Sequence, residues 1–184
     1  VAPRRTVLRP GGERRSATGG HQPNPLVFVP GLNDPLYRVT DAGWFALVIA
    51  AHCRRYADDR PVYMVSRPPG IPEGTDTHEM AEGYVGVLEA LAGESDPDRR
   101  VDLVGLSMGG FLVTHLAADH PRLVGRAVLG LAADRLSDRG RTVVDRWRRW
   151  ADAGDWRSIY LDACDVVARG GRRRAMRAAA RGYD

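Results

Sequence analysis

Ser107 lies in the stretch of this sequence whose residue types and spacing point most clearly to chemistry. Residues 105–109 read GLSMG, so a glycine stands two positions before the serine and another two positions after it. The glycines suit a very tight turn between a strand and a helix, where bulkier side chains would clash. Such a turn lifts the serine hydroxyl above the sheet as a nucleophile. The other interpretation is an ordinary loop serine between two glycines.

The start of the following helix adds a second chemical group, the backbone N–H of Met108. The first N–H groups of a helix have no partner within the helix, and the helix dipole adds to their preference for negative charge. The Met108 N–H is therefore a candidate donor to the oxyanion of a tetrahedral intermediate.

Short apolar runs alternate with helical patterns on both sides of Ser107. The pattern predicts strands within residues 25–35, 60–66, 100–106 and 125–133, helices at 40–59, 76–93 and 108–120, and an edge strand at 6–10. Such alternation builds right-handed βαβ units. We therefore expect an α/β fold with a mostly parallel sheet flanked by helices. In such folds function gathers at the carboxyl ends of the strands, where Ser107 is expected to lie.

The character of the sequence changes after residue 134. Amphipathic helices are predicted at residues 141–154 and 155–171, followed by an arginine-rich helix, and no further strand pattern appears. We expect a flexible N-terminal segment at 1–22, an α/β core at 23–135 and a helical cap at 136–184.

The composition is that of an ordinary globular protein. The chain has 184 residues, of which 43% are hydrophobic and 27% charged, enough to bury one core. No apolar run is long enough to span a membrane, and the N-terminal segment lacks the apolar region of a secretory signal. Cys53 and Cys164 lie far apart in predicted helices, which argues against a disulfide scaffold. The sequence therefore predicts a cytoplasmic protein without a membrane span.

The basic residues are all arginine, and the net charge is +4. They cluster in DRWRRW and RGGRRRAMRAAARG, which raises the hypothesis of a nucleic-acid binder. No nucleic-acid-binding motif accompanies the clusters, and a solvated helix face explains them equally simply, so this hypothesis ranks last. The histidines and cysteines show no metal-ligand spacing, so we expect no metal and no organic cofactor.

With these motifs the sequence resembles the α/β-hydrolase fold family over about residues 24–135. The segment LVFVPGLND is similar to the family's oxyanion strand and loop, which implies that the N–H of Leu32, beside Gly31, completes the oxyanion hole. Pro30 stands where the family commonly has histidine. The segment SRPPGIPEG is similar to the loop after the family's fourth strand. HPRLVGRAVLGLAA is similar to its sixth strand and the preceding helix end, where His120 is a structural stop.

The resemblance also implies an acid and a histidine, and neither stands at its usual place. The family's acid follows the seventh strand and its histidine the eighth, yet this sequence has no histidine after His120. Some members place the acid after the sixth strand, which here is Asp134; a turn cap is the other interpretation of that residue. His115 follows Ser107 on the same helix, about 12 Å along its axis, and cannot reach it. His78 begins the preceding helix and is not favoured as the base.

The resemblance implies hydrolysis of an ester, thioester or amide of a small-molecule acyl substrate through an acyl-serine intermediate. Aromatic side chains of the cap would line an acyl pocket or simply pack: Trp147, Trp150, Trp156 and Tyr160. We expect the chain to stop before the last strands of the fold, so that the base and acid lie elsewhere and an exposed strand edge favours self-association. The competing hypothesis is a non-catalytic binding protein that kept the serine turn and lost the triad.

Overall fold

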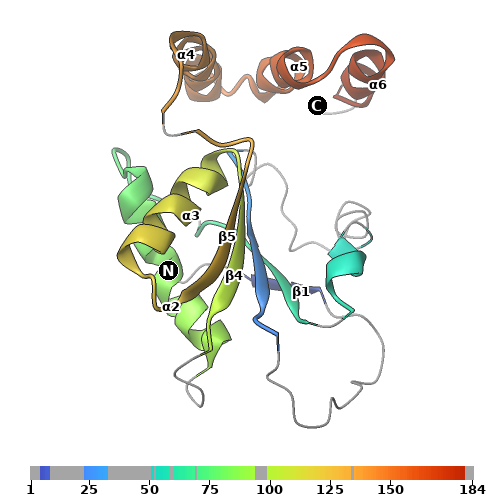
Figure 1. Cartoon of the computed structure of the whole chain (residues 1–184). Helices are drawn as coiled ribbons and strands as arrows, with labels where there is room; N and C mark the ends of the chain where they lie inside the picture. Colours follow the sequence, from blue (N-terminus) through green and yellow to red (C-terminus); the bar gives the residue numbers. More distant parts are fainter. Residues whose placement is uncertain are drawn as a thin grey trace. The chain divides into compact units, whose positions relative to one another are not determined.

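The computed structural model describes residues 5–8, 23–32, 51, 53–58, 60–68, 70–93, 99–133 and 135–180. The chain divides into two compact units, Val1–Asp134 and Arg135–Asp184 (Figure 1). None of the helices in the described part of the chain is long and apolar enough to cross a membrane.

The first unit is built on a five-stranded sheet with the strand order β1-β3-β2-β4-β5. The strands are β1 (Arg5–Leu8), β2 (Leu26–Val29), β3 (Val62–Val65), β4 (Val101–Leu106) and β5 (Val124–Gly130). Only β1 runs antiparallel to its neighbour; the other four strands are parallel. The predicted α/β fold with a mostly parallel sheet is therefore confirmed. The N-terminal segment supplies the outer strand β1, close to the predicted edge strand.

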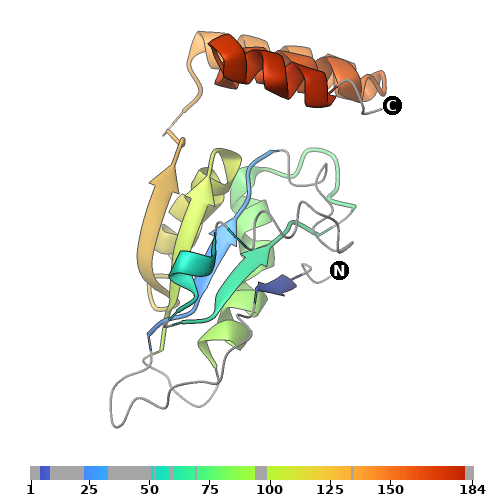
Figure 2. The ribbon, with the colours of Figure 1, turned by 90° about the vertical axis from the view of Figure 1, so that its right-hand side faces the viewer.

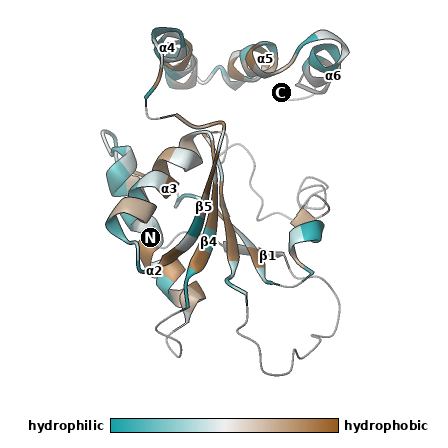
Figure 3. Cartoon of the chain, in the orientation of Figure 1, coloured by the Kyte–Doolittle hydropathy of each residue, from teal (hydrophilic) through white to brown (hydrophobic). Residues whose placement is uncertain are grey.

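Helices α2 (Thr77–Ala92) and α3 (Met108–Asp119) cover one face of the sheet, and the short helix η2 (Arg54–Tyr56) lies on the other face (Figures 1 and 2). Side chains alternate between these faces along each strand. Val27, Val29 and Leu103 are buried in one core together with residues of α2 and α3. Leu26 and Phe28 pack instead with Cys53 and Val62 on the opposite face. The strands accordingly carry hydrophobic residues along most of their length (Figure 3).

Local contacts define the two ends of α2. Asp76 accepts a hydrogen bond from the backbone N–H of Glu79, whose side chain accepts one from the Asp76 N–H, and together these bonds form a capping box. The Glu79 N–H also holds the pKa of the Asp76 carboxyl below its usual value. Gly93 ends the helix with a φ of 89°, in the region that favours glycine. Most of the predicted helix at 40–59 lies outside the described residues.

A buried carboxylate closes the end of the sheet opposite Ser107. Asp102 is 5% exposed and accepts hydrogen bonds of 3.0 Å from Asn24 Nδ2 and Arg60 Nη1. A Cβ on Gly125 would lie 2.7 Å from Asp102 Oδ1, so this group packs directly against β5. A buried charge is tolerated only when it has partners. The contacts of Asp102 with Asn24 and Arg60 therefore fix the segments that lead into β2 and β3.

The strand order reverses between β2 and β4. The chain passes from β2 to β3 on one side, then crosses back through α2 to β4 on the other side of β2. The connections that follow β2 and β4 therefore leave the carboxyl ends of these neighbouring strands in opposite directions. Ligands of open α/β sheets bind at such a point. Leu32 follows β2 and Ser107 follows β4, so both lie at this reversal.

Strand β5 forms the other edge of the sheet in the described part of the chain. It pairs with β4, while Val128 and Leu129 are 56% and 51% exposed. An apolar, unpaired strand edge is a template for association, so self-association through β5 remains a prediction.

The described residues of the second unit form the helices α4 (Asp138–Asp152), α5 (Trp156–Val167) and α6 (Gly170–Ala180). Asp162 of α5 accepts hydrogen bonds of 2.6 Å from Arg146 Nη2 and from the Trp147 indole N–H, both on α4. Asp165 pairs α5 with Arg177 of α6. Burial raises the pKa of the Asp162 carboxyl, but the two hydrogen bonds outweigh it and hold this pKa below its usual value.

Replacing Asp162 by asparagine should lower the free energy of unfolding by about 1 kcal/mol at pH 7, because a charge-assisted hydrogen bond is lost. The pKa of Asp162 is lower in the folded protein than in the unfolded chain, where it is about 3.9. The stabilisation is therefore present above about pH 3.9 and is lost as the pH falls through the pKa of the folded state. Urea unfolding followed by circular dichroism from pH 7 to about pH 2 measures this difference.

Asp152→Asn is the matched control, since its carboxylate is 71% exposed and lies 3.9 Å from Arg148 Nε. It should change stability by less than about 0.5 kcal/mol at every pH. A difference between Asp162→Asn and the wild type that stays constant with pH would contradict the role of the charge.

Candidate active site

Ser107 occupies a strained turn between β4 and α3. Its φ is 54° and its ψ is −120°, a conformation that residues other than glycine rarely adopt. Two backbone hydrogen bonds hold the turn: the Ser107 N–H donates to Gly130 O at 2.8 Å, and the Gly110 N–H donates to Ser107 O at 2.9 Å. The residue is exposed. The backbone thus presents the serine to solvent at the point that the sequence predicts.

The flanking glycines are required by close backbone contacts. A Cβ on Gly105 would lie 2.4 Å from Gly109 O, and a Cβ on Gly109 would lie 2.2 Å from Val29 O. Neither contact is with a flexible side chain, so an alanine at either position would push backbone segments apart. Gly110 adds a third close approach, since its Cβ would lie 2.3 Å from the Cβ of Ala132.

The two expected oxyanion residues, Leu32 and Met108, lie next to the same guanidinium group. Arg67 Nη2 donates a 3.1 Å hydrogen bond to Leu32 O, and Arg67 Nη1 lies 3.5 Å from Met108 Sδ. Leu32 follows β2, Arg67 follows β3 and Met108 follows β4, so the carboxyl ends of three neighbouring strands meet here. Arg67 therefore ties the loop after β2 to the start of α3.

Arg67 was not among the residues expected from the sequence. The sequence predicts its segment, SRPPGIPEG, to be a loop and gives no role to any of its side chains. The available signal is that Arg67 directly follows the strand predicted within residues 60–66, because such positions line the functional edge of the sheet.

The described histidines contact residues other than the serine. His115 Nε2 lies 3.2 Å from Thr77 Oγ1, His78 Nε2 lies 3.2 Å from an Asp119 carboxylate oxygen, and His120 Nε2 lies 2.7 Å from Glu82 Oε1. In the part of the chain that the structure describes, no histidine contacts Ser107. His21, His52 and the candidate acid Asp134 lie outside the described residues.

The second unit contains a groove of about 790 Å³ between α4 and α5. Of the four aromatic residues expected to line an acyl pocket, only Trp147 lines this groove, together with Val143, Val144 and Val166. Trp150 instead lies under the Arg146 guanidinium, whose carbon is 5.5 Å from the ring centroid, and Trp156 is 48% exposed. The groove walls therefore combine aliphatic side chains with charged ones, and Trp147 is their aromatic residue.

A family model described as the alpha/beta hydrolase family matches residues 26–183. The chain belongs to this family. The match confirms the resemblance seen in the sequence and extends it, because the helices after residue 135 fall within the matched range. A comparison with curated proteins gives no match.

Solved structures of the family share the fold at low sequence identity. An alpha/beta hydrolase enzyme from a Medee basin deep-sea metagenome library is 16% identical, with a TM-score of 0.61 over 86% of this chain and 51% of its own. Homoserine O-acetyltransferase from Staphylococcus aureus is 14% identical, with a TM-score of 0.64 over 99% and 66%. A thermophilic esterase from Thermogutta terrifontis is 19% identical, with a TM-score of 0.55 over 89% and 57%. This chain thus spans between half and two thirds of the length of these structures.

Replacing Gly109 by alanine should destabilise the protein by about 1–3 kcal/mol, because the new Cβ meets Val29 O. Gly86→Ala in the exposed face of α2 is the matched control, since its Cβ would meet nothing within 4 Å. Alanine is the better helix former, so the control should raise stability by up to about 1 kcal/mol. Urea denaturation checks both; equal effects from the two variants would refute the steric explanation.

Replacing Arg67 by alanine should speed amide hydrogen exchange at Gly31 and Leu32 by roughly 3- to 10-fold, because the loop loses its charged hydrogen-bond donor. Native-state exchange measured by NMR or mass spectrometry gives this ratio. Arg122→Ala, an exposed arginine between α3 and β5, should leave the loop unchanged. Unchanged exchange in Arg67→Ala would show that other contacts hold the loop.

Proposed function

We propose that this chain carries the nucleophile and the oxyanion hole of a serine hydrolase that acts on an ester, thioester or amide. The observation that carries the proposal is the strained, exposed conformation of Ser107 between β4 and α3. Strain in a backbone persists only where the surrounding contacts enforce it, and it concentrates at functional sites. Here three glycine contacts and two backbone hydrogen bonds enforce it.

In the proposed reaction the Ser107 hydroxyl attacks the carbonyl carbon of the substrate and gives its proton to a base. The carbonyl oxygen becomes an oxyanion, which accepts hydrogen bonds from the N–H groups of Met108 and Leu32. Collapse expels the leaving group with a proton and leaves an acyl-serine, which water then hydrolyses to the acid and free serine. The Arg67 contacts with Leu32 O and Met108 Sδ hold the two residues that carry these N–H groups next to each other.

The base of this reaction is not one of the described histidines. Each described histidine is engaged between α2 and α3, and a serine hydroxyl is a poor nucleophile without a base in hydrogen-bond reach. We assign the base to a residue outside the described part of the chain or to another polypeptide segment. Asp134 stays the candidate acid that the family resemblance implies.

The substrate is a small acyl compound, and we propose that residues 136–184 act as a cap over the site. The groove between α4 and α5 has Val143, Val144 and Trp147 on its wall beside charged residues, and these apolar side chains offer part of the surface that an acyl chain needs. Among the solved structures of similar fold, one is an esterase and one an acetyltransferase, activities that both transfer an acyl group.

A second candidate function is that of a non-catalytic binding protein. The absence of a histidine beside Ser107 among the described residues favours it. On this view the strained serine and the oxyanion donors hold a carbonyl or carboxylate ligand without cleaving it.

A fluorophosphonate probe separates the two functions, because it phosphonylates only a serine that can attack. We expect slow labelling of the 184-residue chain at Ser107, with a rate that rises steadily between about pH 6 and pH 9, because none of the described histidines assists. Peptide mapping by mass spectrometry identifies the labelled residue, and Ser107→Ala should abolish the label.

Labelling that is equal in Ser107→Ala would overturn the nucleophile assignment. A fast reaction with an inflection near the ordinary histidine pKa of about 6.5 would place the base within this chain. His21→Ala and His52→Ala would then identify it. Complete lack of labelling, with binding of a carboxylic acid at the same site, would support the non-catalytic function.

A further inference from the structure

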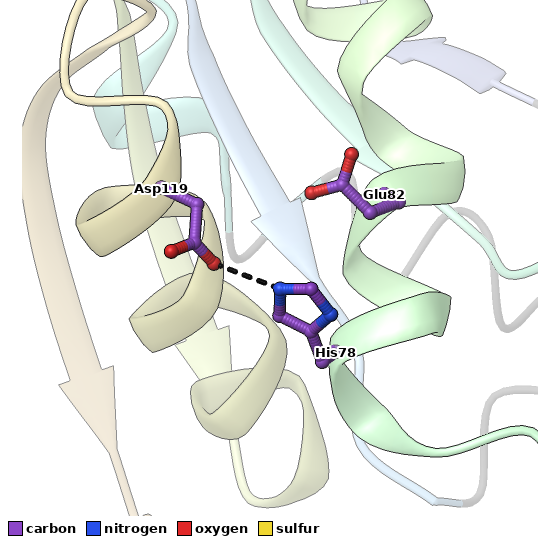
Figure 4. A group of neighbouring side chains, drawn as sticks. All are labelled: His78, Glu82 and Asp119. Atoms are coloured by element: carbon purple, nitrogen blue, oxygen red, sulfur yellow. Dashed lines mark ion pairs between the residues drawn. The ribbon is translucent and has the colours of Figure 1, made fainter.

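Two histidines and two carboxylates gather on the outer surface where α2 and α3 pack together. His78 and Glu82 stand four residues apart on α2, which brings them to one face of that helix. Asp119 and His120 end α3. The side chains of His78, Glu82 and Asp119 converge from the two helices (Figure 4), and their ligand atoms all lie within 4.8 Å of one another.

We propose that His78, Glu82 and Asp119 form a binding site for a divalent zinc-type metal ion. The His78 Nε2–Asp119 Oδ2 distance is 3.2 Å. Two ligand atoms bound to zinc at about 2.1 Å in a tetrahedron stand about 3.4 Å apart, so this pair already has the required spacing. Imidazole nitrogen together with carboxylate oxygen is a donor set that zinc accepts.

His120 borders this cluster of three ligands. Its Nε2 lies 2.7 Å from Glu82 Oε1, so the ring holds the carboxylate that lies beside His78 and Asp119. The two carboxylates provide two negative charges, which neutralise a divalent cation. The side chains of His78 and Glu82 are 53% and 47% exposed, so an ion can enter directly from solvent.

The site is separate from the proposed nucleophile. Asp119 lies twelve residues beyond Ser107 along α3, a distance of about 18 Å. A metal here would therefore link α2 to α3 and stabilise the layer that supports the serine, without touching the substrate. No metal-ligand spacing is visible in the sequence, because the ligands come from two helices that are separated by β4.

Zinc chloride titrated into tag-free protein in a calorimeter tests the proposal. We expect one zinc ion per chain with a dissociation constant in the micromolar range, and a rise in melting temperature that EDTA reverses. His78→Ala and Asp119→Asn should each weaken binding at least tenfold. Circular dichroism in EDTA shows whether these variants are folded.

His115→Ala is the matched control, since its ring lies edge-on to that of His78, with centroids 5.2 Å apart, while its Nε2 faces Thr77 Oγ1. It should keep zinc affinity within about twofold. Lack of saturable zinc binding by the wild type, or full binding by folded His78→Ala, would overturn the site. Equal losses in His115→Ala and His78→Ala would overturn the proposed ligand set.

Discussion

The backbone of α3 comes so close to the end of β2 at Gly109 that no side chain fits between them. A Cβ there would stand 2.2 Å from Val29 O, and the matching approach at Gly105 leaves 2.4 Å to Gly109 O. Because this contact joins two backbones, it sets the distance between the loop after β2 and the first turn of α3. The positions of Leu32 and Met108, the strain at Ser107 and the bridge made by Arg67 all depend on it.

The features that the sequence predicts well are those determined over a few residues. The GLSMG spacing locates the turn because both glycine contacts involve neighbouring segments, and the capping box of α2 joins residues only three apart. Arg67, Asp102 and the group around His78 escaped prediction because their partners come from distant strands and helices. The sheet order that unites them is a property of the whole chain, and no local pattern contains it.

Membership of the alpha/beta hydrolase family fits the part of the molecule that the described residues build. They supply the strand ends, the strained serine and the residues Leu32 and Met108 at the point where the strand order reverses. The three described histidines instead connect α2 with α3, away from the serine. Under the proposed function, the described residues would supply the nucleophile and the two oxyanion donors, and the base would lie outside them.

Ser107 also bears on the stability of the protein. A residue with a side chain at a φ of 54° costs about 1–3 kcal/mol relative to a relaxed backbone, and glycine would avoid most of that cost. Selection for stability alone would therefore favour glycine at position 107. The serine side chain at this position therefore carries a cost in stability that a glycine would avoid, a trade-off of the kind found at functional sites.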